Sequence, residues 1–154
     1  MAETADLIMQ LFNHYSALII GVLIFLIVLS AVRRKRQWLI LVGVMTAYIG
    51  AYLALRPVAR PSTPVAGTPM LLEVQSPFCL GCVAAKPMVD RLERDLRDKI
   101  VVWRVDVQSD EGRQLMKQYH IEFTPTFILF DVAGKERWRG TGRLDAEAVR
   151  YALQ

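Results

Sequence analysis

Charge is missing from two long stretches of this chain of 154 residues. No Asp, Glu, Lys or Arg occurs in the 26 positions from Leu7 to Val32 or in the 19 positions from Gln37 to Leu55. A helix needs about 20 apolar residues to cross the hydrocarbon core of a bilayer. The two runs therefore predict a pair of transmembrane helices, at about residues 15–32 and 38–55, and they exclude an ordinary soluble domain for this half of the chain.

The first apolar run also lacks a basic flank. Residues 1–14, an N-terminal segment before the predicted span, carry Glu3 and Asp6 as their only charges, whereas a secretory signal peptide begins with basic residues. A second apolar run follows closely. The sequence therefore favours a permanent two-helix hairpin over a cleaved leader.

The connection between the two runs, residues 33–37, is strongly basic. It reads Arg33-Arg34-Lys35-Arg36-Gln37, and short loops rich in Lys and Arg stay on the cytoplasmic side of a membrane. This loop predicts that both termini, and the polar half of the chain with them, lie on the extracytoplasmic side of a cell membrane or a thylakoid-type membrane.

Small residues recur every four positions in the second run, at Gly43, Ala47 and Ala51. Such a stripe allows two helices to approach closely. It is expected either to face the first helix of the hairpin or to pack against another subunit of a larger membrane complex.

The net charge of +4 does not indicate a nucleic-acid-binding protein. Four of the nineteen basic residues belong to the short loop, where membrane topology explains them. The others are interleaved with acids, as in residues 90–98, which is typical of a solvated helix surface.

A proline-rich linker, residues 56–69, joins the apolar half to the polar half. It contains Pro57, Pro61, Pro64 and Pro69, with small residues between them. This composition predicts an extended, semi-rigid spacer that holds the following domain a short distance from the membrane.

Residues 70–154 alternate short apolar strands with amphipathic helices. Because a crossover between parallel strands is right-handed, the first two strands are expected to pair in parallel, and the last two form an antiparallel hairpin. The predicted fold class is α/β, a β-α-β-α-β-β-α domain with a four-stranded mixed sheet and helices on both faces. The periodicity predicts strands at 70–75, 100–107, 126–130 and 136–140, and helices at 79–97, 110–119 and 146–153. The stripe of the first helix that is expected to face the core is Val83, Met88, Val89, Leu92 and Leu96.

The chain has only two cysteines, and both lie in one motif, Cys79-Leu80-Gly81-Cys82, between the first predicted strand and helix of this domain. A Cys-x-x-Cys in a β-α-β setting is a redox signature. At the start of a helix, unpaired backbone N–H groups and the helix dipole favour a thiolate. Cys79 is therefore predicted to have a lowered pKa and to act as the nucleophile. Cys82 lies one turn later, where it can attack the resulting mixed disulfide.

Residues 70–154 resemble the thioredoxin family. Five landmarks accompany the cysteine pair: an aromatic residue directly before it, an acid on the preceding strand, a proline in the following helix, a cis-proline segment and a glycine after the last strand. In this sequence they are Phe78, Glu73, Pro87, Thr124-Pro125-Thr126 and Gly142. The resemblance implies a thioredoxin fold without its usual additional N-terminal strand and helix, because the linker and the hairpin take that position.

The resemblance also implies roles for individual residues. Glu73 is expected to be the base that removes the proton of Cys82 through a water molecule; the alternative is a carboxylate on an edge strand that faces solvent. Phe78, Thr124 and Pro125 are expected to bind substrate. A cis X–Pro bond would present the Thr124 backbone to a polypeptide that pairs with it as an added strand.

The activity implied by the resemblance is that of a thiol–disulfide oxidoreductase, here tethered to a membrane, with no cofactor other than the Cys79–Cys82 disulfide. The expected partners are exported proteins that carry disulfides or thiols and a transmembrane protein that donates electrons. Reducing thioredoxins usually carry Gly-Pro between the cysteines, whereas Leu80-Gly81 stands here, so the direction of electron flow stays open. The alternative is an accessory subunit of a larger membrane complex that carries a thioredoxin-like domain.

A further alternative is a module that binds Cu(I) through its two thiolates, which suit soft copper. Copper-relay domains of this fold normally add a nearby histidine, and the two histidines of this chain, His14 and His120, lie far from the motif in sequence.

Two charged residues, Arg104 and Asp106, lie near the end of the second predicted strand. They are expected to exert a modest electrostatic influence on the cysteine site.

Overall fold

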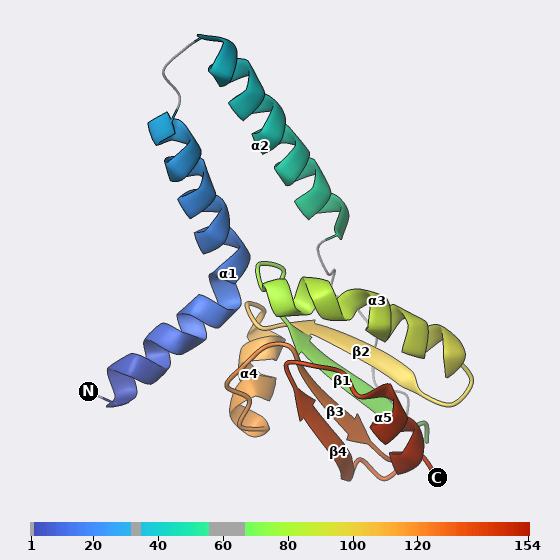
Figure 1. The fold of residues 1–154 in the computed structure, drawn as a ribbon. Coiled ribbons are helices and arrows are strands. Elements are labelled where there is room, and N and C mark those ends of the chain that lie inside the picture. The colour runs from blue at the N-terminus through green and yellow to red at the C-terminus, as the bar shows by residue number, and fades with distance from the viewer. Residues whose placement is uncertain (1, 32–34, 56–66) are drawn as a thin grey trace.

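The structure, a computed structural model, describes residues 2–31, 35–55 and 67–154. The predicted linker, apart from residues 67–69, and Arg33 and Arg34 of the basic loop lie outside the described residues. The order from β1 onward confirms the predicted β-α-β-α-β-β-α domain (Figure 1). In chain order the elements are α1 (Ala2–Ala31), α2 (Lys35–Leu55), β1 (Met70–Gln75), α3 (Leu80–Asp95), β2 (Val101–Asp106), α4 (Asp110–Gln118), β3 (Thr126–Phe130), β4 (Glu136–Thr141) and α5 (Ala146–Ala152).

The four strands form one mixed sheet in the order β2-β1-β3-β4. β1 pairs in parallel with β2, with Met70 beside Val101, and antiparallel with β3, which forms a hairpin with β4. The predicted pairing is confirmed. β1, which leads into the cysteine motif, therefore lies in the interior of the sheet with a strand on either side.

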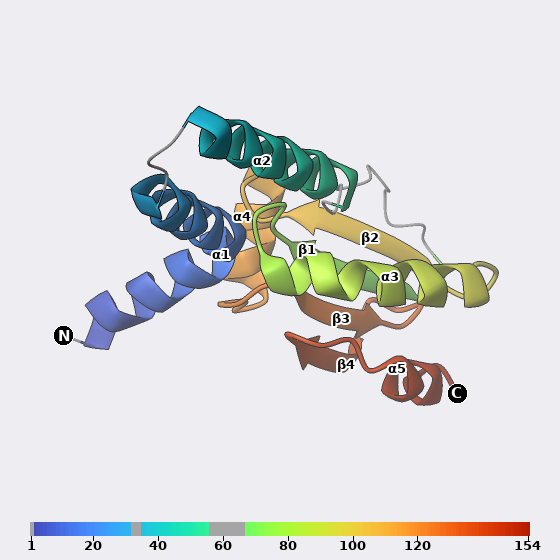
Figure 2. The same cartoon turned by 45° about the horizontal axis from the view of Figure 1, so that its top comes forward.

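Helices cover both faces of the sheet, as predicted (Figures 1 and 2). Successive residues of a strand point to opposite faces, so the apolar run of β1 serves two layers. Leu71 joins Val89 of α3 and Val149 of α5 in one buried cluster. Leu72 joins Leu115 of α4 in another.

The stripe that α3 presents to the core differs from the predicted stripe at its edges. Met88 is 37% exposed and Val83 is only half-buried. Met88 lies one position before Val89 and is therefore rotated by about 100° around the helix axis, away from the centre of the buried stripe. The buried residues follow a spacing of three and four: Cys82, Ala85, Val89, Leu92 and Leu96.

Both N-terminal helices, α1 and α2, are long and apolar enough to span a membrane by length and composition. The apolar segments are Leu7–Ser30, of 24 residues, and Trp38–Leu55, of 18 residues, and 6% of each is buried within the protein. The first begins before residue 15, because α1 is helical from Ala2. Tyr15 (φ −117°, ψ 16°) is not helical, and α1 bends there (Figure 1).

The two apolar helices meet through an aromatic residue rather than through the small-residue stripe. Tyr48 packs on Gly21, where an added Cβ would lie 3.1 Å from the tyrosine oxygen. Gly43 has open space where a side chain would begin, and Ala47 and Ala51 are exposed. The expectation that the stripe faces α1 is therefore wrong, since α2 is rotated to present its tyrosines instead.

Candidate active site

The cysteine motif lies at the junction of β1 and α3. Cys79 is the N-cap of α3, and its sulfur accepts a 3.4 Å hydrogen bond from the backbone N–H of Cys82. The Cys79 thiol donates to the Thr124 carbonyl at 3.4 Å, and the Ser76 N–H donates to the Cys82 sulfur at 3.5 Å. Both cysteines are free thiols, with 1% of Cys79 and 0% of Cys82 exposed.

The two thiols differ strongly in acidity. A hydrogen bond with the Cys82 thiol, together with the backbone N–H groups of Cys82 and Gly81, lowers the pKa of Cys79 to about 6 although burial opposes this shift. The hydrogen bond with Cys79 raises the pKa of Cys82, and burial raises it further. At neutral pH Cys79 is therefore mostly thiolate while Cys82 keeps its proton. A nucleophile followed by a resolving thiol requires this asymmetry.

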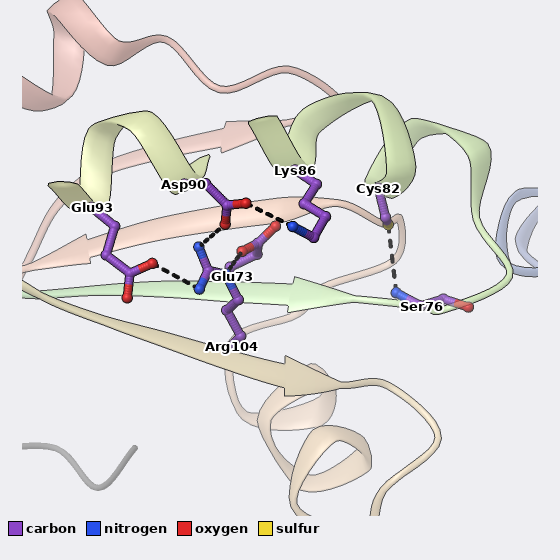
Figure 3. A network of polar contacts seen from close by, with 7 residues as sticks. All are labelled: Glu73, Ser76, Cys82, Lys86, Asp90, Glu93 and Arg104. Atoms are coloured by element: carbon purple, nitrogen blue, oxygen red, sulfur yellow. Dashed lines mark hydrogen bonds and ion pairs between the residues drawn. The ribbon is translucent and has the colours of Figure 1, made fainter. Parts of the chain in front are cut away.

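Glu73 is buried in the interior of the sheet, with 1% of its surface exposed. Its strand has partners on both sides, so the alternative of a solvent-facing carboxylate on an edge strand is wrong. The parallel register places Arg104 of β2 beside it, and Arg104 Nε donates to Glu73 Oε2 at 2.9 Å (Figure 3). Within the described part of the chain this carboxylate is bonded to Arg104 and not to Cys82. A proton that moves between Glu73 and Cys82 therefore needs a bridging molecule such as water.

Two further carboxylates, both from α3, hold Arg104. Its Nη2 lies 2.9 Å from Asp90 Oδ1 and its Nη1 lies 2.9 Å from Glu93 Oε2 (Figure 3). Lys86 Nζ contacts the second oxygen of Asp90 at 2.7 Å. All three guanidinium nitrogens thus bind carboxylates. The cluster connects the buried acid with the half-buried surface of α3.

Burial raises the pKa of Glu73 to about 7, although the Arg104 guanidinium lowers it. The charges of Asp90 and Glu93 raise the pKa further. Glu73 can therefore gain or lose a proton near neutral pH, which is the range that suits a general base.

Arg104 is closer to the chemistry than the sequence indicates, because it is bonded directly to Glu73. A signal was present in the sequence: Glu73 is the fourth residue of β1 and Arg104 the fourth of β2, and parallel strands that start together pair these positions. Asp106, which was expected to act in the same way, instead fixes the turn before α4. Its carboxylate accepts a 2.9 Å hydrogen bond from the Gln108 N–H.

The Thr124–Pro125 segment faces the cysteine motif, and its peptide bond is cis, as the resemblance implies. A Cβ on Gly81 would lie 3.2 Å from Pro125 Cδ, so the missing side chain at Gly81 allows this close approach. Gly142, left-handed at φ 78°, donates its N–H to the Pro125 carbonyl at 2.8 Å. The structure therefore brings the cysteine pair, Thr124 and Pro125 together.

The site also has neighbours that no motif indicated. Asn13, at the bend of α1, binds both backbone groups of Thr124: its amide nitrogen lies 3.0 Å from the carbonyl and its oxygen 2.9 Å from the N–H. Phe78 stacks with Tyr15 of α1 and Tyr52 of α2, with ring centroids 6.0 and 6.3 Å apart. The signal in the sequence was slight, a polar run at residues 13–16 inside the first apolar stretch.

Among residues 2–31, 35–55 and 67–154, no group of three or more His, Cys, Asp or Glu side chains is placed to hold a metal ion. His14 lies at the bend of α1, where its backbone carbonyl accepts a hydrogen bond from the Ser76 hydroxyl at 3.0 Å. His120 follows α4 with a left-handed backbone, φ 52°. His14 therefore lies next to the segment that leads into the cysteine motif, whereas His120 lies beyond the end of α4.

A Cys-x-x-Cys at the start of the first helix of a β-α-β-α-β-β-α domain, opposite a cis-proline, defines the class of thioredoxin-fold dithiol proteins. The sequence model of the thioredoxin family matches residues 63–154, and the chain belongs to this family. Residues 1–62, which include both apolar helices, lie outside the match.

Several thioredoxins are similar to this chain. Thioredoxin 1 of Nostoc sp. is 36% identical over 62 residues, which are 40% of this chain and 56% of that protein. The chloroplastic thioredoxin Y2 of Arabidopsis thaliana is 32% identical over 90 residues, 56% of this chain and 52% of that protein. The chain thus spans about half the length of the curated relatives it matches.

A solved structure shows the same fold. The exposed lipoprotein thioredoxin Etrx1 of Streptococcus pneumoniae superposes with a TM-score of 0.51 at 19% identity, covering 57% of this chain and 84% of that one.

Proposed function

We propose that this protein is a membrane-tethered thiol–disulfide oxidoreductase that exchanges disulfides with extracytoplasmic proteins through Cys79 and Cys82. One observation carries the proposal: a thiol with a pKa of about 6 caps α3 and faces the cis-proline segment, while the second thiol, one turn later, keeps its proton. Membership of the thioredoxin family supports the same activity.

The reaction begins when the Cys79 thiolate attacks one sulfur of a substrate disulfide. A mixed disulfide forms, and the other substrate sulfur leaves as a thiolate. Cys82 then loses its proton to Glu73 through water and attacks the Cys79 sulfur. The second substrate thiolate leaves, and a Cys79–Cys82 disulfide remains. Two electrons have passed from the protein to the substrate; the reverse sequence oxidises a substrate dithiol.

The membrane tether and the side of the membrane form part of the proposal. Two helices of suitable length and composition support the tether, and the basic loop at 33–37 supports an extracytoplasmic domain with both termini on that side. A chloroplastic relative fits a thylakoid-type membrane as well as a cell membrane. An extracytoplasmic dithiol becomes oxidised unless it is re-reduced, so a transmembrane electron donor is the expected partner.

A second candidate function is that of an accessory subunit in a larger membrane complex. The observation that favours it is the exposed stripe of Gly43, Ala47 and Ala51 on α2, which α1 does not use. Purification of the full chain in mild detergent, followed by identification of co-eluting subunits, tests this candidate. A single species in the eluate counts against it.

The test of the leading proposal is a trap for the mixed disulfide. The full chain with Cys82→Ser, reduced and mixed with a protein that carries an exposed disulfide, should accumulate a covalent adduct through Cys79. The matched variant Cys79→Ser should accumulate none. If Cys82→Ser forms no adduct, and the wild-type cysteines show no reversible dithiol–disulfide couple, the proposed activity is wrong.

A further inference from the structure

We propose that residues 13–17 of α1, which we call the strap, occupy the substrate groove of the redox site, so that Cys79 meets a protein partner only after the strap is displaced. The inference rests on the proposed function, because it concerns access to the same dithiol. In both views the bend of α1 lies beside the start of α3 (Figures 1 and 2). The family match at 63–154 does not include the strap.

The Asn13 side chain binds Thr124 in the way that an added strand would. A strand residue that pairs with a neighbour offers one donor and one acceptor to it. The carboxamide of Asn13 does the same: Nδ2 donates to the Thr124 carbonyl at 3.0 Å, and Oδ1 accepts from the Thr124 N–H at 2.9 Å. Oδ1 also accepts from the Thr124 hydroxyl at 3.0 Å. The backbone groups expected to receive a substrate polypeptide are therefore already bound.

The next turn of the strap, with Ser16 and Ala17, binds the backbone around the cysteine motif. Ser16 Oγ accepts from the Leu80 N–H at 3.1 Å, which is one of the unpaired donors at the start of α3. The Ala17 N–H donates to the Phe78 carbonyl at 3.0 Å. The strap therefore bridges the two segments, one before α3 and one before β3, between which a substrate would lie.

The aromatic ring of the motif is covered as well. Phe78 stacks with Tyr15 of the strap and with Tyr52 of α2, and the Tyr52 hydroxyl donates to the Pro77 carbonyl at 2.6 Å. Both apolar helices thus contact the residues that immediately precede Cys79.

The consequence is that the nucleophile is closed off. Cys79 is 1% exposed, although a thiolate that attacks a protein disulfide must meet the incoming sulfur directly. The carbonyl that accepts from the Cys79 thiol, that of Thr124, is the same one that Asn13 holds. A polypeptide therefore cannot pair with Thr124 and present its disulfide to Cys79 while the strap is in place.

The strap is bound in a manner that permits release. Among the described residues, the two buried apolar clusters of the domain contain no side chain from α1 or α2. The contacts of the strap described above are hydrogen bonds and one ring stack, that of Tyr15 on Phe78, and an arriving polypeptide can replace them with its own. The strap can leave without opening the core of the domain.

The first test measures access to Cys79 in the reduced full chain, in lipid nanodiscs, as the rate of alkylation by iodoacetamide with the modified residue identified by mass spectrometry. Asn13→Ala and Ser16→Ala each remove a side chain that hydrogen-bonds the strap to the domain. The loss of one hydrogen bond shifts the equilibrium between the bound and the displaced strap by roughly fivefold. We expect the double variant to be alkylated on the order of tenfold or more faster than wild type. Rates are compared well above the pKa of Cys79, where thiolate content no longer differs.

Matched controls lie on the same helix. Gln10→Ala removes a carboxamide one turn before Asn13, and Ser30→Ala removes a hydroxyl that donates to the Ile27 carbonyl at the far end of α1. Both should be alkylated at the wild-type rate. Equal rates for wild type and the double variant would overturn the strap.

A second measurement needs no variant. The N–H groups of Leu80 and Thr124 are bound by Ser16 and Asn13, so in the wild-type chain they should exchange with deuterium slowly. Exchange of both at the rate of a free amide overturns the strap.

Disulfide exchange separates this inference from the proposed function. With a protein disulfide as substrate, the double variant should react faster than wild type. With a small disulfide as substrate, the difference in rate between the double variant and wild type should be smaller. If the double variant is alkylated faster but neither it nor wild type exchanges with any disulfide, the strap proposal holds and the proposed oxidoreductase activity is wrong. If both exchange disulfides but are alkylated at the same rate, the oxidoreductase activity holds and the strap proposal is wrong.

Discussion

Arg104 and Glu73 form a buried ion pair across two parallel strands, with 2.9 Å between Nε and Oε2. The acid proposed as the base is therefore bonded to a cation that also binds Asp90 and Glu93. When Glu73 takes up a proton, the two carboxylates of α3 still balance the charge of Arg104. The cluster thus allows the acid to titrate near neutral pH without leaving an unpaired cation in the interior, which would be strongly destabilising.

Glu73→Gln should change how stability depends on pH. The pKa of Glu73 in the folded protein, about 7, lies above its ordinary value of 4.5, so the folded state binds this proton more tightly. Its contribution to the free energy of unfolding, about 3 kcal/mol, is complete below about pH 4.5 and is lost as the pH rises to about 7. The variant should lack this loss. Urea unfolding of the full chain at a series of pH values, followed by tryptophan fluorescence, measures it.

The control for this titration is Glu136→Gln. The Glu136 side chain is 38% exposed on β4, and its hydrogen bond with Arg139 lowers its pKa, so it titrates below the range in which Glu73 loses its proton. The control variant should keep the wild-type dependence between about pH 4.5 and 7. The assignment to Glu73 is wrong if Glu73→Gln and wild type lose the same free energy of unfolding over this range.

Arg104→Leu should be strongly destabilising. It leaves three carboxylates without their common cation, one of them 1% exposed, and breaking a buried pair in this way costs about 3–5 kcal/mol. Arg113→Leu is the matched control, because Arg113 pairs with Asp110 at the surface, where a pair contributes about 1 kcal/mol or less. Urea unfolding compares the two, and equal losses would contradict the role given to Arg104. The double variant Arg104→Leu with Glu73→Leu should recover part of the lost free energy of unfolding, because the buried carboxylate without a cation is then removed.

Local patterns in the sequence were sufficient to predict the domain. The strands at 70–75 and 126–130 follow from short apolar runs, and the start of α5 follows from Asp145, whose carboxylate accepts from two N–H groups of the first turn. The cysteine motif follows from residue type and spacing, whereas the acid before it, Glu73, follows from the resemblance to the thioredoxin family.

The contacts between distant segments could not be predicted in the same way. Asn13 and Thr124 are 111 positions apart, and nothing in either neighbourhood indicates the other. Arg104 reaches Asp90 and Glu93 only because α3 packs on the sheet with these two residues, which flank its buried stripe, toward β2. The exposed side of α2 depends on where Tyr52 docks, so the small-residue spacing did not determine which face meets α1.

Cys82→Ala should raise the pKa of Cys79 above its value of about 6. The hydrogen bond with the Cys82 thiol is the largest of the influences that lower it, and alanine cannot replace that donor. Cys82→Ser keeps a hydroxyl donor at the same position, so it should raise the pKa less. The ultraviolet absorbance of the thiolate, followed against pH in the full chain, reports the midpoint. An alanine variant with the wild-type midpoint would show that the backbone N–H groups alone stabilise the thiolate.

Gly81→Ala tests whether the close approach of the cis-proline segment matters for the reaction. An added methyl group would lie 3.2 Å from Pro125 Cδ, so Pro125 has to move by a few tenths of an ångström, whereas the Cys79 sulfur, at 3.6 Å, would be at an ordinary contact distance. Pro125 is held through its carbonyl by the Gly142 N–H, so the whole segment shifts away from the motif. We expect adduct formation with a protein disulfide to slow by roughly fivefold or more, because small displacements of reacting groups reduce rates strongly.

The same substitution should have little effect on stability, and this separates a change in geometry from unfolding. Alanine in the first turn of α3 gains up to about 1 kcal/mol in helix propensity over glycine, which offsets the crowding. Gly81→Val, with two more methyl groups toward Pro125, should slow the adduct further. Gly43→Ala, where open space receives the methyl group, should match wild type in both measurements. If both Gly81 variants react with the protein disulfide as fast as wild type, contact between the motif and the cis-proline segment does not limit the reaction.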